Sequence, residues 1–149
     1  MNLKLMRLDE KYIHRIVVDA INRVLTENNQ RFETFYRGYN SQYDSQRSHL
    51  FWITDNASYA KEYGDVAEEI TVDKNKMRIA SIYGIDDIIG EFDYYDGPDE
   101  DETKLILSQG YNGYGFYANE DDSYCICLLS SIPIVRRRVL TKEEYENID

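Results

Sequence analysis

The spacing of apolar residues changes once along this chain, near residue 30. Between residues 9 and 29, apolar side chains recur at intervals of three or four, at Ile13, Ile16, Val17, Ala20, Ile21, Val24 and Leu25. This spacing predicts one amphipathic helix, with Asp9 at its N-cap and Asn28 and Asn29 at its end. From residue 33 onward, aromatic and β-branched residues gather in short runs, which is the pattern of strands.

These runs predict strands at 33–40, 49–54, 66–73, 77–83, 113–119, 123–130 and 133–140. Short helices are predicted at 56–63, ended by Gly64, and at 102–109, ended by Gly110. A helical turn near 85–92, an acidic surface loop at 93–102 and a fraying helix in the tail complete the pattern. Because few helices separate the strands, it favours an α+β fold with a mostly antiparallel or mixed sheet. A length of 149 residues suits a single domain, with its core at about 33–140.

The composition is that of a folded protein that stays inside the cell. Apolar residues make up 42% of the chain, and no apolar run approaches the roughly 20 residues of a membrane span. The first residues become charged too early for a secretory signal, so we expect a cytoplasmic protein. Cys125 and Cys127 stand two apart, where thiols diverge too far for an easy disulfide. His14 and His49 add no metal spacing, so we expect buried free thiols and no metal.

The charge of the chain is strongly one-sided, with a formal net charge of −11. Direct binding to nucleic acid is therefore disfavoured, whereas an acidic surface suits a basic partner. Arg136, Arg137 and Arg138 cluster on a late strand, where we favour a charged sheet edge over a partner-binding patch. Fourteen tyrosines suit clefts and interfaces, and equally a sheet surface without a ligand.

No familiar catalytic signature of hydrolases, metalloproteases, phosphate-binding loops or dinucleotide folds occurs in the sequence. The glycine-rich stretch 110–115 enters a strand rather than a helix, so it is a weak phosphate site. Arg37 needs an explanation, because it stands beside Gly38 at the centre of an aromatic strand. It either pairs with an acidic neighbour at the sheet edge or faces a cleft and binds an anion.

Three separate segments combine aromatic residues with polar groups. They are Tyr-Arg-Gly at 36–38, Phe-Trp-Ile-Thr and the following helix at 51–63, and Gly-Tyr-Asn-Gly-Tyr-Gly-Phe at 110–116 before the acidic turn 119–122. Their order and spacing over about residues 33–130 resemble the ADP-ribosyltransferase superfamily, which uses NAD as donor. The bacterial-toxin branch has an arginine in the first segment, and the poly(ADP-ribose) polymerase branch has an aromatic strand that runs into a helix. The resemblance implies an α+β core split into two small sheets.

The resemblance also implies an NAD site without metal, formed by Arg37, Gly38, Tyr36, Tyr59, Tyr63 and Trp52. The planar guanidinium of Arg37 would bind the pyrophosphate with paired hydrogen bonds. Gly38 would let the backbone approach the nicotinamide amide closely. The ring of Tyr59 or Tyr63 would stack on the nicotinamide.

Cleavage of the nicotinamide bond needs a carboxylate near the ribose, since the transition state resembles an oxocarbenium ion. The resemblance gives this role to Glu120, with Asp121 and Asp122 as alternatives. Thr54 would supply the hydroxyl that supports this acid or the ribose. The chain lacks a clear Glu-x-Glu or Gln-x-Glu motif, which leaves the type of modified residue open.

The leading hypothesis is therefore a small mono-ADP-ribosyltransferase that modifies a host macromolecule. Such minimal cores occur in bacterial effectors, toxins and phage proteins, anti-CRISPR proteins among them. The acidic surface suits a host protein that is basic or binds nucleic acid. A second hypothesis is a non-enzymatic inhibitor whose acidic loop at 93–102 imitates nucleic acid. A third keeps the fold but makes it an NAD glycohydrolase or an RNA 2′-phosphotransferase.

Overall fold

The chain forms two units that are described separately, residues 1–32 and 33–149. The structure is a computed structural model, and it describes residues 13–22, 30–42, 49–118 and 123–149. Residues 13–22 of the first unit are helical, inside the predicted helix 9–29. The predicted ends of that helix lie outside the described residues. A single domain for the whole chain stays a prediction.

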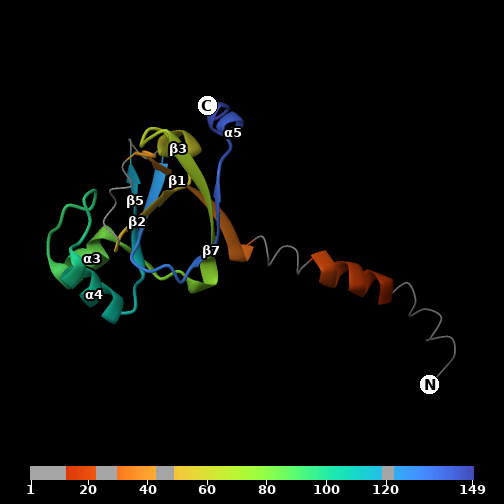
Figure 1. Ribbon diagram of the computed structural model, residues 1–149. Coiled ribbons are helices and arrows are strands. Elements are labelled where there is room, and N and C mark those ends of the chain that lie inside the picture. The colour runs from red at the N-terminus through yellow and green to blue at the C-terminus, as the bar shows by residue number, and fades with distance from the viewer. Residues whose placement is uncertain (1–12, 23–29, 43–48, 119–122) are drawn as a thin grey trace, which may run out of the picture. The chain divides into compact units, whose positions relative to one another are not determined.

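The second unit is built on one mixed sheet of seven strands, which confirms the α+β class (Figure 1). Their bounds are β1 (Phe32–Tyr39), β2 (Phe51–Thr54), β3 (Val66–Asp73), β4 (Ile79–Ser81), β5 (Gly113–Ala118), β6 (Ser123–Leu128) and β7 (Ile134–Val139). The order is β4-β5-β6-β2-β1-β3-β7, with β4 and β5 parallel. The prediction of two small sheets is wrong, because β1 is hydrogen-bonded to both β2 and β3 and so joins the two halves.

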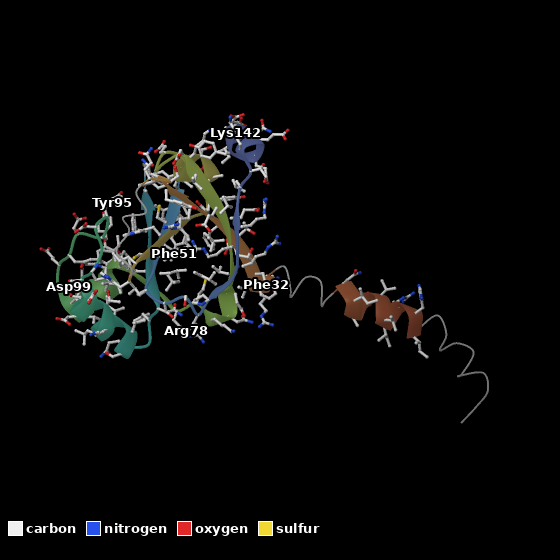
Figure 2. All side chains as sticks on the ribbon, in the orientation of Figure 1. Phe32, Phe51, Arg78, Tyr95, Asp99 and Lys142 are labelled. Atoms are coloured by element: carbon white, nitrogen blue, oxygen red, sulfur yellow. The ribbon has the colours of Figure 1, made fainter. Side chains whose placement is uncertain are left out.

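One face of the sheet encloses a core made by strands alone. Its buried members are Phe35, Ile53, Ile70, Val72, Ile126 and Leu128, and Phe51 packs against them near the centre of Figure 2. Ile79 of β4 and Ile134 of β7 also pack on this cluster. Since these two strands stand at opposite ends of the strand order, the sheet must curl around the core. We call this side the inner face.

The outer face of the sheet is covered by helices. Its core contains Tyr114, Cys125 and Cys127 from the sheet, with Ile85 of α3 (Ile82–Ile89) and Ile106 of α4 (Glu100–Ser108). Figure 1 shows α3 and α4 together beside β5. The strand predicted at 77–83 is longer than the observed β4. The strand ends at Ser81 because the side chain of this residue caps the N-terminus of α3. Both thiols are free and buried, as predicted.

Several acidic residues of the predicted loop 93–102 begin a helix instead. Asp99 is the N-cap of α4 and forms a capping box with Glu102. Glu100 and Asp101 lie in the first turn, where carboxylates stabilise the helix dipole. The tail helix α5 (Lys142–Glu146) begins with a second capping box, between Thr141 and Glu144. Local capping explains these parts of the acidic composition.

The three consecutive arginines lie on β7, which ends the strand order as predicted for a charged edge. Arg137 and Arg138 donate hydrogen bonds to Glu68 and Glu69 on β3. Arg138 also binds Glu144, and this pairing lowers the pKa of that carboxyl to about 2. In the part of the chain that the structure describes, no helix is long and apolar enough to cross a membrane.

Candidate functional site

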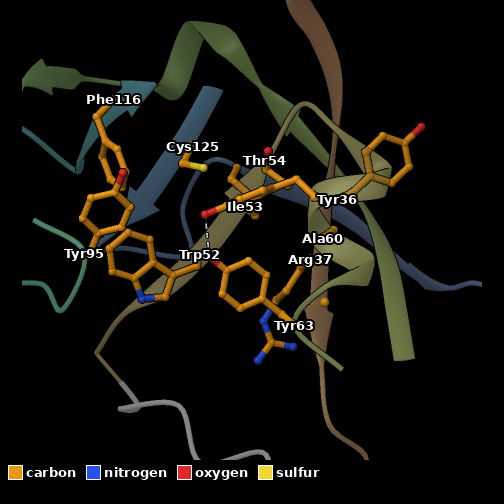
Figure 3. A pocket seen from close by; sticks show the side chains of 12 residues that line it. Tyr36, Arg37, Trp52, Ile53, Thr54, Ala60, Tyr63, Tyr95, Phe116 and Cys125 are labelled. Atoms are coloured by element: carbon orange, nitrogen blue, oxygen red, sulfur yellow. Dashed lines mark hydrogen bonds between the residues drawn. The ribbon is translucent and has the colours of Figure 1, made fainter. Parts of the chain in front are cut away.

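A pocket of about 130 Å³ opens on the outer face of the sheet. It lies where β1 and β2 meet α2 (Ala57–Lys61), a short helix capped by the side chain of Asn56. Figure 3 shows aromatic side chains from several elements around it. Its lining consists of Tyr36, Arg37, Gly38, Trp52, Ile53, Thr54, Tyr59, Ala60, Tyr63, Tyr95, Phe116 and Cys125. The three segments singled out in the sequence therefore meet at one pocket.

Strand register explains which residues share this face. Tyr36 of β1 is opposite Thr54 of β2, and Thr54 is opposite Cys125 of β6. Cys125 is in turn opposite Phe116 of β5. Because side chains alternate across a strand, these four residues project to the same side of the sheet. Tyr36 and Thr54 are thus brought together as the sequence predicted, although a role in binding stays a prediction.

The polar groups inside the pocket form a chain of neutral donors and acceptors. The hydroxyl groups of Tyr59 and Tyr63 are 2.5 Å apart, the dashed line in Figure 3. The Cys125 side chain lines the same pocket and is paired with Thr54 of the neighbouring strand. Burial raises the pKa of the Tyr59 phenol and of the Cys125 thiol. Both groups are therefore protonated and uncharged at neutral pH.

Arg37 belongs to the lining of the pocket, but its guanidinium lies on the opposite, inner face of the sheet. Its side chain shares the inner face with Phe35, and its guanidinium donates to Glu68 Oε1 at 3.0 Å. The same guanidinium lies 4.7 Å from the ring centre of Tyr39 and 4.9 Å from that of Phe51. In Figure 3 it points away from Thr54 and Cys125. The alternative of an acidic partner therefore describes the geometry of its guanidinium, and a role of Arg37 in binding an anion stays a prediction.

Gly38 is required by the protein itself rather than by a ligand. A Cβ atom at this position would stand 1.7 Å from the carbonyl oxygen of Ala60 in α2. The absent side chain lets α2 pack directly on β1, which brings Tyr59 over the sheet. Gly64 is similar, since a Cβ there would lie 2.2 Å from the backbone of Tyr39. The helix predicted at 56–63 and ended by Gly64 is shorter in the structure, Ala57–Lys61, and the φ of Gly64 is not positive.

Five of the twelve lining residues were not predicted as site residues: Ile53, Ala60, Tyr95, Phe116 and Cys125. Cys125 was interpreted as an ordinary buried thiol, although its place opposite Thr54 puts it beside the predicted site. Tyr95 comes from the connection between α3 and α4, and its ring is 5.0 Å from that of Phe116. Nothing in the sequence pattern links residue 95 to the strands. The aromatic content of 93–102 was the available signal, and it was assigned to a surface loop.

The predicted catalytic acids Glu120, Asp121 and Asp122 lie outside the described residues. On either side of them, Ala118 and Ser123 are paired at the end of the β5–β6 hairpin. Ser123 accepts a hydrogen bond from the Asn56 side chain, 3.0 Å away. Among the described lining residues, none carries a carboxylate. The assignment of the acid stays a prediction.

The residues of the pocket fit an uncharged or cationic planar group better than a metal. Among residues 13–22, 30–42, 49–118 and 123–149, no group of three or more His, Cys, Asp or Glu side chains could hold a metal ion. The aromatic walls suit a flat ring, and the hydroxyl groups suit an amide.

No family model matches this sequence, and no curated protein matches it. Among solved structures, the chain is similar to one chain of the crystal structure of the M. tuberculosis MbcT-MbcA toxin-antitoxin complex. The two chains are 11% identical with a TM-score of 0.41, over 78% of this chain and 88% of the other. A likeness at this level is too distant to assign a family or an activity.

Proposed function

We propose that the outer-face pocket binds the nicotinamide end of NAD and that the protein transfers ADP-ribose from NAD to a macromolecule. One observation carries this proposal. Three sequence segments that resemble the NAD site of ADP-ribosyltransferases line a single pocket, through Tyr36, Thr54, Tyr59 and Phe116 in particular. The arginine of the first segment does not contribute its charge, so the proposal rests on the aromatic and hydroxyl groups.

The size of the pocket supports one ring as its occupant. An engineered protein cavity of roughly 150 Å³ binds benzene. The volume here, about 130 Å³, is of that order. A single nicotinamide ring therefore fits, while the pyrophosphate, the second ribose and the adenine would lie outside.

The polar groups of the pocket support an amide on that ring. The Thr54 and Tyr63 hydroxyl groups each offer one donor and acceptor lone pairs. An amide needs an acceptor for its NH₂ and a donor for its oxygen, and neutral hydroxyl groups supply both. Tyr63 is 57% exposed, and its hydroxyl is hydrogen-bonded to that of the buried Tyr59.

The chemical step breaks the bond between C1′ of the ribose and the nicotinamide nitrogen. The nicotinamide leaves with the electron pair, and an oxygen, nitrogen or sulfur atom of the acceptor bonds to C1′. A carboxylate, for which Glu120 is the first choice, would stabilise the positive charge on the ribose and accept the proton of the acceptor. In the sequence, Glu120 stands a few residues after Phe116 and a few residues before Cys125. Both of these neighbours line the pocket.

Binding is tested by thermal unfolding with and without millimolar NAD. A ligand that binds the native state raises the melting temperature by mass action. We expect a rise for the wild type and for Tyr83→Ala, because Tyr83 is 80% exposed and outside the pocket lining. Tyr63→Ala should lose the rise. An equal rise in Tyr63→Ala, or no rise in the wild type, would contradict the proposed site.

Transfer is tested with labelled NAD and host lysate, which should yield labelled protein. Glu120→Gln should abolish the label and keep the thermal shift, since it removes the proton acceptor but not the ring pocket. Release of nicotinamide without any acceptor would indicate the glycohydrolase instead. The net charge of −11 supports a basic, nucleic-acid-binding acceptor. The acidic inhibitor gains no support, since Asp99–Glu102 caps and begins α4.

A further inference from the structure

The pocket has the construction of an aromatic box. Six aromatic side chains line it: Tyr36, Trp52, Tyr59, Tyr63, Tyr95 and Phe116. Neighbouring walls stand close to perpendicular, with angles of 78° between Trp52 and Phe116, 71° between Tyr95 and Phe116, and 69° between Tyr59 and Tyr63. Rings that meet nearly at right angles surround a small ligand from several sides. Aromatic boxes of this kind bind quaternary nitrogen cations.

The protein holds its own cations away from this box. Arg37 is the only basic residue in the described lining, and its guanidinium lies on the inner face against Tyr39 and Phe51. Lys61 of α2 lies over the ring of Tyr145 and donates to the carbonyl of Ile148. Neither charge competes for the rings of the pocket.

The charge around the box also favours a cation. Tyr95 forms one wall, and its backbone N–H donates to the carboxylate of Asp93 at 3.0 Å. Asp96 follows in the same turn. The whole chain carries a net charge of −11, so the potential at the pocket mouth attracts positive ligands.

We infer that this pocket is a cation-binding aromatic cage, which recognises the positive charge of an N-alkylated pyridinium as well as its shape. The inference deepens the proposed function and rests on it for the identity of the ligand, since the nicotinamide of oxidised NAD is such a cation. It also has a consequence for turnover. When the bond to C1′ breaks, the ring takes the electron pair and becomes neutral nicotinamide. The cage then holds the product less tightly than the substrate, which favours product release.

The test compares two ligands of the same shape that differ by one charge. In 3-methylbenzamide a carbon atom replaces the positively charged nitrogen of 1-methylnicotinamide. Calorimetric titration of the full chain should give about tenfold tighter binding of the cation, equivalent to about 1.4 kcal/mol. Equal affinity for both, or preference for the neutral amide, would overturn the cage while the NAD site could still stand.

Two variants at one exposed wall identify the source of this preference. Tyr95 is 54% exposed, so its replacement should leave the fold intact. Tyr95→Phe keeps the aromatic face and should keep most of the tenfold ratio, whereas Tyr95→Leu should reduce it several-fold. Tyr83→Leu on α3 serves as the control. A ratio that is unchanged in Tyr95→Leu would exclude Tyr95 as a wall of the cage and contradict the inference.

Failure of the cage and failure of the proposed function are distinguishable. If 1-methylnicotinamide binds tightly but NAD produces no thermal shift, the cage holds and the proposed substrate is wrong. If NAD and both amides bind and charge makes no difference, the proposed substrate holds and the cage is wrong. If no probe binds, both are wrong.

Discussion

The two faces of β1 place aromatic rings beside very different partners. On the inner face, Arg37 lies between the rings of Tyr39 and Phe51 and is bound to Glu68, and both charged side chains are 4% exposed. On the outer face, one residue away, Tyr36 lines a pocket in which Arg37 is the only charged residue of the described lining, and its guanidinium lies on the inner face. The same strand therefore carries an internal cation bound to a carboxylate on one side and a wall of the aromatic pocket on the other. The type of a residue alone does not show whether its side chain has a structural or a functional role. The face of the strand on which the side chain lies does show it.

The largest effect is expected on the inner face, from Glu68→Ala. Glu68 accepts from both Arg37 and Arg137, so its loss leaves buried positive charge without this carboxylate. We expect the free energy of unfolding to fall by about 3–5 kcal/mol, measured by urea denaturation. Glu33→Ala is the control, because the Glu33–Lys74 pair is about half exposed and should cost about 0–1 kcal/mol. A similar loss of unfolding free energy in both variants would contradict burial as the cause of the larger effect at Glu68.

The same face supplies a test of Arg37 itself. Arg37→Met should lower stability, but the folded variant should keep the rise in melting temperature with NAD, because the guanidinium lies behind the pocket. Loss of the rise in a variant that is still folded would restore Arg37 to ligand binding.

The next effect concerns the contact that shapes the pocket, between Gly38 and α2. Gly38→Ala would place a Cβ 1.7 Å from the Ala60 carbonyl oxygen, so α2 must move. Overpacking of this kind costs about 1–3 kcal/mol, and the displaced helix should also weaken NAD binding. Gly84→Ala is a matched control that should raise the stability of the protein rather than lower it. Its Cβ would meet Ala80 at an ordinary 3.5 Å inside helix α3, where alanine is favoured by about 0.5–1 kcal/mol. Thermal unfolding of both variants decides the matter.

Burial of a thiol in the core of the outer face should also make the stability of the protein depend on pH in the alkaline range. Burial raises the pKa of the Cys127 thiol to about 12 from its ordinary 9.0. Between these values the unfolded thiol loses its proton while the folded one keeps it, so stability falls as pH rises. The expected slope is up to about 1.4 kcal/mol per pH unit for this group. Urea denaturation at pH 9 and pH 10 should show a shallower decline for Cys127→Ala than for the wild type. Equal slopes would contradict the burial of this thiol as the cause.

Much of the fold follows from local pattern. The strands β2, β3, β5, β6 and β7 fall within the predicted runs and β1 begins one residue before its run, because short aromatic and β-branched runs are a local property of the sequence. Capping groups are local too, as Asn56 shows for α2. Long-range pairing is not local. The hydrogen bonds from β1 to both β2 and β3 make one sheet, and no single run reveals them.

Seven of the twelve residues that line the candidate site were predicted from the sequence, but the directions of their side chains were not. Tyr36 and Arg37 were both assigned to one NAD site, although neighbouring residues of a strand project to opposite faces, and the sequence does not show which face holds the pocket. That depends on where α2 packs, and so on the contact between Gly38 and Ala60. Tyr95 was beyond prediction for a similar reason, since its connection reaches the strands only through contacts such as that with Phe116.

The smallest effect concerns the hydroxyl pair at the pocket mouth, and here the order of two variants is the prediction. Tyr59 is 8% exposed and Tyr63 is 57% exposed, and their hydroxyl groups are 2.5 Å apart. Tyr59→Phe leaves the Tyr63 hydroxyl to water, so it should cost about 0.5 kcal/mol or less. Tyr63→Phe removes the hydrogen-bond partner of the buried Tyr59 hydroxyl, so it should cost about 1 kcal/mol. The substitution at the exposed residue should therefore be the more destabilising one in urea denaturation. The reverse order would mean that water reaches the Tyr59 hydroxyl and that the pocket is hydrated. A hydrated pocket would bind a nicotinamide ring, or any other cation, less tightly through its aromatic walls than we propose.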